Sequence, residues 1–393
     1  MDERIEGSVK TSGWRFYGTY MPLFLGLFCC HFGIGATLSV LPFYVKGRMG
    51  GGDVSVGTVI AAIAVAVVIT RPIAGRLSDR IGHKTLMMAG AVLCALAGAS
   101  YAVASNLDAL VAVRVLHGIG EGAVFTAGAT WLVALAPAER RGKIVGLYGV
   151  SMWTGVTLGA LAGVMLMKAL DFGPVWAVCA ITPVAGVLLI SRKAAPARVR
   201  AAKKTAFFPG TAFVPGVALA FASMGYAALA SFVSLHMAKR GIDNGILAFN
   251  VFGFAYVGSR LFLGHLPDKL GPYRVALGAA LVEACGLVLV GIAPSLAVAV
   301  IGGFTMGLGL SLLYPSLALV VIRNTDTSQH GAALGMFTSF WDLGVAAGGI
   351  VAGFVASRTG YPAIYVVMLV FAVASAGLVP LAALRRTAAV SQP

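Results

Sequence analysis

The sequence predicts an all-α integral membrane protein of 12 transmembrane helices in two six-helix bundles, and three observations lead to this fold class. Hydrophobic residues make up 59% of the 393 residues and charged residues 11%, with a mean hydropathy of +0.91. That composition belongs in a bilayer, because a soluble domain of this length would precipitate. Apolar stretches near the roughly 20 residues needed to cross the hydrocarbon recur along the whole chain. A charged motif is also written twice, once in each half.

Each apolar stretch predicts one helix. The stretches cover approximately residues 17–45, 54–76, 84–104, 107–136, 142–169, 174–192, 211–238, 243–266, 272–293, 295–322, 330–357 and 361–385. Because lipid offers no partner to a free backbone amide, a chain that crosses it must form helices or a closed barrel. These stretches are too long and too uniformly apolar for barrel strands, so helices are expected throughout.

The duplication divides the chain into halves. The motif GRLSDRIG at residues 75–82 recurs 189 positions later as GHLPDKLG at residues 264–271. The same offset relates Arg71 to Arg260, Gly118 to Gly307, Gly120 to Gly309, Gly142 to Gly331, Gly146 to Gly335, Gly155 to Gly344 and Gly159 to Gly348. Such a repeat is typical of transporters built from two tandem units. We therefore expect residues 1–192 to form the N-terminal six-helix bundle, 193–210 a basic cytoplasmic linker and 211–393 the C-terminal six-helix bundle.

The cations predict the orientation of the chain in the membrane. Most of them fall in the N-terminal segment, in the loops on the same side and in the linker, which carries six between Arg192 and Lys204. Because cytoplasmic loops hold the excess of Lys and Arg, both termini of this multi-pass chain should face the cytoplasm, in the plasma (cytoplasmic) membrane. The net charge of +15 is spread over this rim in small groups, which suits an anionic leaflet and argues against a nucleic-acid partner.

Other classes of function are disfavoured by the residues present. The five cysteines fall within apolar stretches and have no metal-ligand spacing, so no metal and no cofactor is expected. No glycine-rich phosphate loop occurs, and ATP is therefore not the expected driver. The loops leave no room for a catalytic domain, and no nucleophile–base set is visible, so the chain is not expected to be an enzyme.

The duplicated motif supplies candidate gating residues where the second and eighth helices should meet the cytoplasm. Asp79 and Arg80 stand between Gly75 and Gly82 in the first copy, and the second copy rebuilds the pair as Asp268 and Lys269. A carboxylate at the N-terminus of a neighbouring helix gains from exposed amides and the helix dipole, and losing that contact can release two bundles from each other. The alternative is a charge that only solubilises the turn.

The fourth helix carries three ionisable residues on nearly one stripe. Arg114, His117 and Glu121 are spaced so that they lie on one face. Glu121 falls about 20 Å along this helix, near the membrane centre, where a charged carboxylate is costly to hold and is a functional candidate by default. We interpret Glu121 as a proton-coupling group. The alternatives are a neutral carboxyl held by a hydrogen bond between helices, and an arginine that snorkels to the outer rim.

Further ionisable groups lie within the other apolar stretches. Asp342 and Glu283 are acids midway along the eleventh and ninth helices, and His31 is halfway along the first. Histidine titrates in the range useful for proton exchange, although a lone histidine can equally be a hydrogen-bonded packing residue. Arg71 and Arg260 stand near the cytoplasmic ends of their helices and are expected to brace the charged hairpins rather than to contact substrate.

Large side chains near the helix centres are candidates to line a substrate cavity. They are Trp153, Trp341, Met152, Tyr148 and Phe337, together with His117 on the fourth helix. Aromatic and flexible apolar side chains suit a flat or amphipathic solute. The alternative for each of them is packing in the protein core.

Three segments resemble signatures of the major facilitator superfamily. GRLSDRIGHK resembles the loop signature between helices two and three of that family, and VRVLHGIGEG, with Arg114, Gly118 and Gly120, is similar to its helix-four signature. The helix-five segment GVSMWTGVTLGALAG resembles the signature of drug/proton antiporters, but Ala160 stands after Gly159 where that pattern has proline. The resemblance covers the whole chain through helix number, duplication and orientation.

The resemblance implies a proton-coupled secondary transporter with the major facilitator fold that works by alternating access. It implies that the Arg114 position takes part in proton coupling and that helix eleven, which carries Asp342, borders the central cavity, whereas helix nine, which carries Glu283, is peripheral. We expect an antiporter that exports a small amphipathic molecule or drug, with protons, a small-molecule substrate and the lipid bilayer as its partners, and a monomer. The alternative is a proton-coupled symporter for uptake of a nutrient or organic anion, and a receptor or membrane enzyme is the remaining class.

Overall fold

The computed structural model describes residues 18–137, 140–194, 210–326 and 329–390, and these segments form helices and short connections without a strand. The first half contains six long helices, α2 (Met21–Phe43), α3 (Asp53–Ile81), α4 (His83–Ser100), α5 (Leu107–Leu135), α6 (Arg141–Leu170) and α7 (Phe172–Ser191), with the π-helical turn η1 (Tyr44–Arg48) extending α2. The second half contains η3 (Gly210–Ala212), α8 (Phe213–Lys239), α9 (Ile246–Leu263), the short α10 (Leu266–Leu270), α11 (Pro272–Ile292), α12 (Leu296–Arg323), α13 (His330–Thr359) and α14 (Tyr361–Val390).

The expected twelve long helices are confirmed in number and, within a few residues, in position. Eleven of them are long and apolar enough to cross a membrane. The remaining long helix, α4, begins with the polar pair His83 and Lys84, which lowers its mean hydropathy. Large apolar side chains such as Ile69 and Phe262 are exposed on the outside of the molecule, as lipid-facing positions require.

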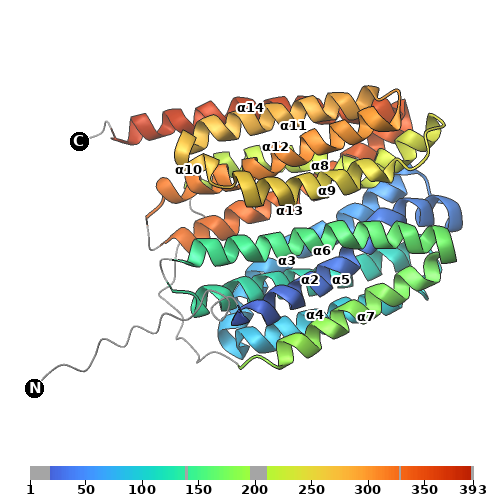
Figure 1. Cartoon of the computed structure of the whole chain (residues 1–393), viewed down its shortest axis with the longest axis horizontal. Helices are drawn as coiled ribbons and strands as arrows, with labels where there is room; N and C mark the ends of the chain where they lie inside the picture. The colour runs from blue at the N-terminus through green and yellow to red at the C-terminus, as the bar shows by residue number, and fades with distance from the viewer. Residues whose placement is uncertain (1–17, 138–139, 195–209, 327–328, 391–393) are drawn as a thin grey trace, which may run out of the picture.

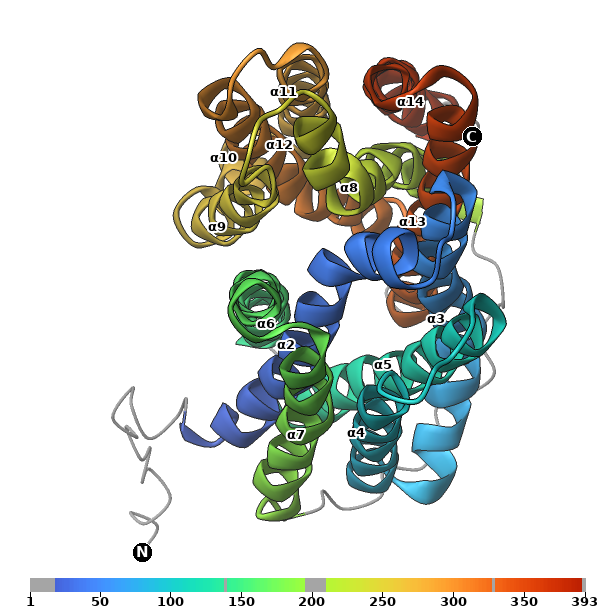
Figure 2. The ribbon, with the colours of Figure 1, turned by 90° about the vertical axis from the view of Figure 1, so that its right-hand side faces the viewer.

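The long helices run side by side and form two groups, one from each half of the chain (Figure 1). Helix α2 begins and α14 ends at the same end of the molecule, on the left of Figure 1, and we call this the terminal end and the opposite one the far end. Viewed from the far end, α3 and α6 of the first bundle face α13 and α9 of the second (Figure 2). The expected fold class, two six-helix bundles, is confirmed.

The connection after α3 is much shorter than the apolar stretch suggests. Helix α3 continues past residue 76 to Ile81, so Asp79 and Arg80 belong to its last turn, and Gly82 alone leads into α4. Gly82 has φ 95° and ψ 144°, and Gly271, its equivalent in the second half, has φ 90° and ψ 137°. A side chain would strain this backbone, which explains why both copies of the motif end in glycine.

Glycines allow very close helix packing both within a bundle and between the bundles. A Cβ on Gly155, Gly159 or Gly163 of α6 would lie 2.7, 2.0 or 2.5 Å from a backbone oxygen of α2, so no side chain fits at that crossing. A Cβ on Gly57 of α3 would lie 2.3 Å from the backbone oxygen of Gly349 on α13. The α3–α13 seam between the bundles is therefore a contact of backbone against backbone in its far-end half.

Candidate functional site

A histidine and a glutamate meet inside the first bundle. His31 on α2 is 1% exposed, and its Nε2 lies 3.7 Å from Oε1 of Glu121 on α5. The other ring nitrogen, Nδ1, lies 3.0 Å from the backbone oxygen of Leu27. A carbonyl oxygen only accepts, so Nδ1 carries a hydrogen and Nε2 of the neutral ring presents its lone pair to Glu121. The two side chains can therefore share a single additional proton.

An ion pair joins the two bundles. Nε of Arg71 on α3 lies 2.7 Å from Oδ2 of Asp342 on α13, and the Nη2 group of Arg71 donates to Oδ1 at 3.3 Å. The two side chains are 13% and 8% exposed. Arg71 also stands over the ring of Phe125, 4.6 Å from its centroid. Of the ion pairs formed within the described part of the chain, this is the one that links the bundles.

The expectation that Arg71 braces the charged hairpin is therefore wrong. Helix α3 extends ten residues beyond Arg71, which places the guanidinium group about 15 Å inside the terminal end rather than at it. Arg260 does not brace its hairpin either, because its guanidinium donates to the backbone oxygen of Ser311 at 3.1 Å. The two charged pairs stand on α2 and α5 and on α3 and α13, and together they make up the candidate charged site.

An aromatic cluster stands beside these pairs at the interface of the bundles. Trp153 on α6 is 6% exposed, and its ring centroid lies 4.1 Å from that of Tyr256, 5.4 Å from Tyr226 and 5.7 Å from Trp341. The last three residues belong to the second bundle, so Trp153 crosses the interface. Trp341 directly precedes Asp342 on α13. Two of the predicted cavity residues, Trp153 and Trp341, are therefore brought together next to the charged pairs.

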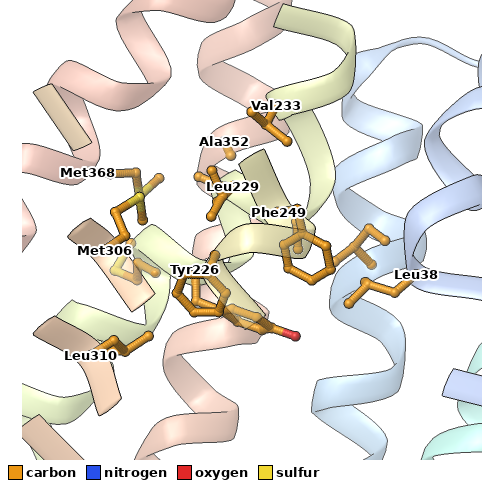
Figure 3. Close-up of a cluster of buried hydrophobic side chains, with 14 of the residues drawn as sticks. Leu38, Tyr226, Leu229, Val233, Phe249, Met306, Leu310, Ala352 and Met368 are labelled. Carbon is orange, nitrogen blue, oxygen red and sulfur yellow. The ribbon is translucent and has the colours of Figure 1, made fainter. Parts of the chain in front are cut away.

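Apolar packing closes the interface on the far side of this cluster. Figure 3 shows Leu38 of the first bundle facing Phe249 of the second, with Tyr226 alongside. Leu38 is 7% exposed and Phe249 2%. The aromatic cluster therefore has a tightly packed apolar floor toward the far end.

The other predicted cavity residues lie elsewhere. Tyr148 is buried in the first bundle and donates its hydroxyl to the backbone oxygen of Val124 at 3.2 Å. Phe337 is fully buried and packs on Tyr314, with ring centroids 5.3 Å apart. Met152 is half-buried and packs against the cores of both bundles. Tyr148 and Phe337 therefore pack in the protein core, which is the alternative that the sequence left open for them.

Arg114 and His117 share a partner that is not Glu121. Arg114 is fully buried, donates from Nε to the backbone oxygen of Val59 at 3.1 Å and from Nη1 to the Tyr101 hydroxyl at 3.4 Å. His117 Nδ1 lies 3.1 Å from the same hydroxyl. The stripe on α5 is thus divided, with Glu121 turned to His31 and the other two turned to Tyr101. A snorkelling role for Arg114 is excluded because its guanidinium is enclosed.

The predicted gating residues lie at the terminal end. Asp79, Arg80, Asp268 and Lys269 are exposed, and within the described residues none of them forms an ion pair. Lys84, just after Gly82, instead donates to the backbone oxygens of Ser191 and Lys193 at 2.7 and 2.8 Å. The hairpin is thereby tied to the end of α7 in its own bundle.

The far end carries polar contacts between the bundles that sequence reasoning missed. Lys46 Nζ lies 2.6 Å from Asp53 Oδ1 and donates to the Tyr361 hydroxyl at 2.8 Å, and that hydroxyl donates to Asp53 at 3.0 Å. Lys46 and Asp53 belong to the first bundle and Tyr361 begins α14 of the second. We call these three residues the far-end clasp. Lys168 donates to Asn244 Oδ1 at 2.6 Å nearby. No sequence pattern pairs these residues, since they belong to elements far apart in the chain, η1, α3 and α14.

A tandem pair of membrane-spanning six-helix bundles with charged and aromatic side chains at the interface defines a multi-pass membrane transporter. The chain belongs to the Major Facilitator Superfamily, whose family model matches residues 23–250 and again 215–393. It is a transporter of that superfamily and not an enzyme.

The relatives agree with this assignment. The chain is 32% identical over 371 residues to the uncharacterized MFS-type transporter YhhS of Escherichia coli (strain K12), covering 91% of this chain and 89% of YhhS. It is 29% identical over 361 residues to an uncharacterized MFS-type transporter of Burkholderia mallei (strain SAVP1), covering 89% and 88% of the two chains.

Two solved structures share the fold. The human organic anion transporter MFSD10 (TETRAN) has a TM-score of 0.72 and 19% identity, covering 92% of this chain and 98% of that one. The nucleoside transporter NupG has a TM-score of 0.75 and 14% identity, covering 93% and 99%. At these identities the likeness concerns the fold alone.

Proposed function

We propose that this transporter is a proton-coupled antiporter that exports a small amphipathic molecule by alternating access. The observation that carries the proposal is the His31–Glu121 pair, in which a carboxyl that is 18% exposed faces a buried imidazole at 3.7 Å. Intramembrane acids are costly to keep and mark proton relays in transporters. A proton bound here neutralises Glu121 beside the Arg71–Asp342 ion pair, so its arrival changes the balance of charge at the interface.

The ion pair between the bundles connects protonation to movement. Arg71 and Asp342 stand on different bundles, so rocking one bundle against the other must stretch or break their contact. A proton passed toward Asp342 would weaken the attraction and release the bundles. Glu121, His31 and Asp342 are the groups to which we assign proton coupling, with Arg114 holding α5 in place through Val59 and Tyr101.

The contacts at the two ends support alternating access. The far-end clasp and the Lys168–Asn244 bond join the bundles at one end, whereas Asp79 and Asp268 have no ion-pair partner within the described residues at the other. We propose that the clasp shuts the far end in this state, and that the two hairpins latch the terminal end in the opposite state. The cation-rich loops favour a cytoplasmic terminal end in the cytoplasmic membrane, and we propose a monomer.

Uptake of a nutrient or organic anion by proton symport is the second candidate. Ala160 stands where the helix-five pattern of drug/proton antiporters has proline, and a structural neighbour is named as an organic anion transporter. The two candidates predict opposite movement of solute for the same proton gradient.

Inverted membrane vesicles test coupling and direction together. Vesicles acidified inside by respiration are offered ethidium and 1-naphthoate as probes, and an antiporter accumulates the probe that it transports. Glu121→Gln removes the proton site with little change in shape, so gradient-driven accumulation should stop while exchange of labelled for unlabelled probe continues.

Glu283→Gln is the matched control, because Glu283 is a fully buried carboxyl of the second bundle that lies outside the site. It should retain the gradient dependence. Unchanged gradient dependence in Glu121→Gln removes the coupling assignment, and probe release on acidification of preloaded wild-type vesicles identifies the symporter instead.

A further inference from the structure

Each half of the chain carries an arginine at the equivalent position of the repeat, but the partners of this arginine differ between the halves. Arg260 on α9 stands 189 positions after Arg71 on α3. Arg71 lies over the ring of Phe125 at 4.6 Å, and Arg260 lies over Tyr314, the residue 189 positions after Phe125, at 5.4 Å. The contact between the arginine and an aromatic ring is therefore repeated in both halves. The carboxylate that pairs with Arg71 is not repeated.

Arg260 has no carboxylate partner. Asp342 pairs with Arg71, and the position 189 residues before Asp342 holds Trp153. Within the described residues no acid lies within 4.0 Å of the Arg260 guanidinium, whose hydrogen bond goes to the backbone oxygen of Ser311 at 3.1 Å. A cation inside a transmembrane helix is costly unless it is paired. Among the described residues, the second bundle therefore holds an arginine that contacts a carbonyl and two rings but has no counter-ion.

Aromatic rings lie beside Arg260 at the interface of the bundles. The guanidinium carbon lies 6.0 Å from the ring centroid of Tyr256, and Trp153 lies against that ring at 4.1 Å. Tyr226 and Trp341 stand around Trp153 at 5.4 and 5.7 Å. A ligand that reaches Arg260 from the interface of the bundles thus meets π-faces immediately next to the charge. This combination suits a molecule with an anionic head and a flat apolar body.

The acids of the site argue against a cationic ligand. Glu121 already faces His31 at 3.7 Å, and Asp342 is held by Arg71 at 2.7 Å. A cation would have to compete with Arg71 for Asp342 or with His31 for Glu121. An anion can pair with Arg260 without breaking any ion pair.

We propose that the transported molecule is an aromatic organic anion, whose carboxylate or sulfonate pairs with Arg260 while its ring packs against Trp153 and Tyr256. The inference deepens the proposed transport function and rests on it. Arginine suits this role because its planar fork can donate two parallel hydrogen bonds to a carboxylate. The anion fills the place that Asp342 fills for Arg71 in the other half.

Binding to the purified full-length chain in lipid nanodiscs tests this assignment without a proton gradient. Three probes share one ring system and differ in charge, namely 1-naphthoate, 1-naphthamide and 1-naphthylmethylammonium. By calorimetry the wild type should bind naphthoate at least tenfold more tightly than the amide. Tightest binding of the ammonium compound, or no measurable binding of naphthoate, overturns the proposal.

Variants locate the selectivity. Arg260→Gln should abolish the preference for naphthoate over the amide, and Arg260→Lys should keep part of it, because lysine retains the charge but not the fork. Arg358→Gln is the matched control, since Arg358 also lies over a ring, that of Phe354 at 5.1 Å, but near the far end of α13. A full naphthoate preference in Arg260→Gln overturns the assignment. If that variant does not fold, Arg260→Lys and the wild-type probe series decide.

Failure of the substrate assignment and failure of proton coupling are distinguishable. Glu121→Gln should bind naphthoate with the wild-type preference over the amide while losing gradient-driven transport. If Arg260→Gln loses the charge preference, the substrate assignment stands. If transport by the wild type does not depend on the proton gradient, the coupling assignment is removed even so. The reverse pattern, gradient-driven transport with no charge preference, removes the substrate assignment.

Discussion

Removing one oxygen atom from the far-end clasp should shift the transporter toward a state in which the far end is open. Tyr361 of the second bundle donates to Asp53 and accepts from Lys46 of the first. The substitution Tyr361→Phe removes the two hydrogen bonds that this hydroxyl makes to the first bundle. It leaves the Lys46–Asp53 ion pair intact within the first bundle, so no charge is left unpaired.

The size of the shift follows from the two lost bonds. Hydrogen bonds to charged groups contribute about 1.5–3 kcal/mol each when enclosed. The Lys46 and Asp53 side chains are 32% and 18% exposed, and water replaces part of the loss, so about 1–2 kcal/mol in total is expected. Since 1.4 kcal/mol corresponds to a factor of ten, the ratio of far-end-open to far-end-closed molecules should rise about 5- to 30-fold.

Distances between spin labels across the far end measure this ratio. Labels on Val103, between α4 and α5, and on Asp243, between α8 and α9, occupy exposed positions on different bundles. In a background without native cysteines, Tyr361→Phe should increase a component at longer distance. Tyr365→Phe is the control, because the Tyr365 hydroxyl is buried one turn further along α14 and has no hydrogen-bond partner in the described part of the chain. Identical distributions for wild type and Tyr361→Phe, or an equal change in both variants, would refute the reasoning.

Three further outcomes are expected. A double-mutant cycle of Arg71→Gln and Asp342→Asn should give a coupling energy of about 1–3 kcal/mol in the free energy of unfolding, and additive effects would contradict the ion pair. Gly57→Ala should lower the thermal unfolding midpoint, at a cost of about 1–3 kcal/mol, because its Cβ would lie 2.3 Å from a backbone oxygen of α13. Gly258→Ala should leave the midpoint unchanged, because nothing in the described structure lies within 4 Å of the added Cβ. Glu283→Met should raise that midpoint, since both carboxyl oxygens of Glu283 are buried without a partner among the described residues and such groups cost about 1–3 kcal/mol. A lower midpoint would point to a partner.

The fold could be predicted almost completely because the bilayer imposes one simple rule on the sequence. Each crossing needs an apolar stretch of similar length, and lipid permits only helices for such stretches. The 189-residue offset between Gly75 and Gly264 added the division into halves. The error at the end of α3 arose because Asp79 and Arg80 are charged but helical. Hydropathy marks where lipid ends, and a helix can continue beyond that point.

The site could be predicted in part. Glu121, His31 and Asp342 stand out in the sequence because ionisable residues are rare in apolar helices. Their pairing could not be predicted, since periodicity describes one helix at a time and does not show which face meets which neighbour. The interface position of Arg71 was missed for the same reason. The equivalence of Arg71 and Arg260 in the repeat was visible in the sequence. That Asp342 pairs with Arg71, whereas its equivalent Trp153 cannot pair with Arg260, is seen only in the structure.

The enclosure of Arg114 constrains how the polypeptide is made. Helix α5 leaves the translocon with an arginine about 10 Å from its first residue, and inserting such a segment alone costs about 2.5–3.5 kcal/mol for that side chain. The carbonyl of Val59 and the hydroxyl of Tyr101, which accept hydrogen bonds from the guanidinium, belong to segments synthesised earlier. During biogenesis the fourth crossing is therefore stabilised by the second and third, and these three must associate before α5 can rest stably in the lipid.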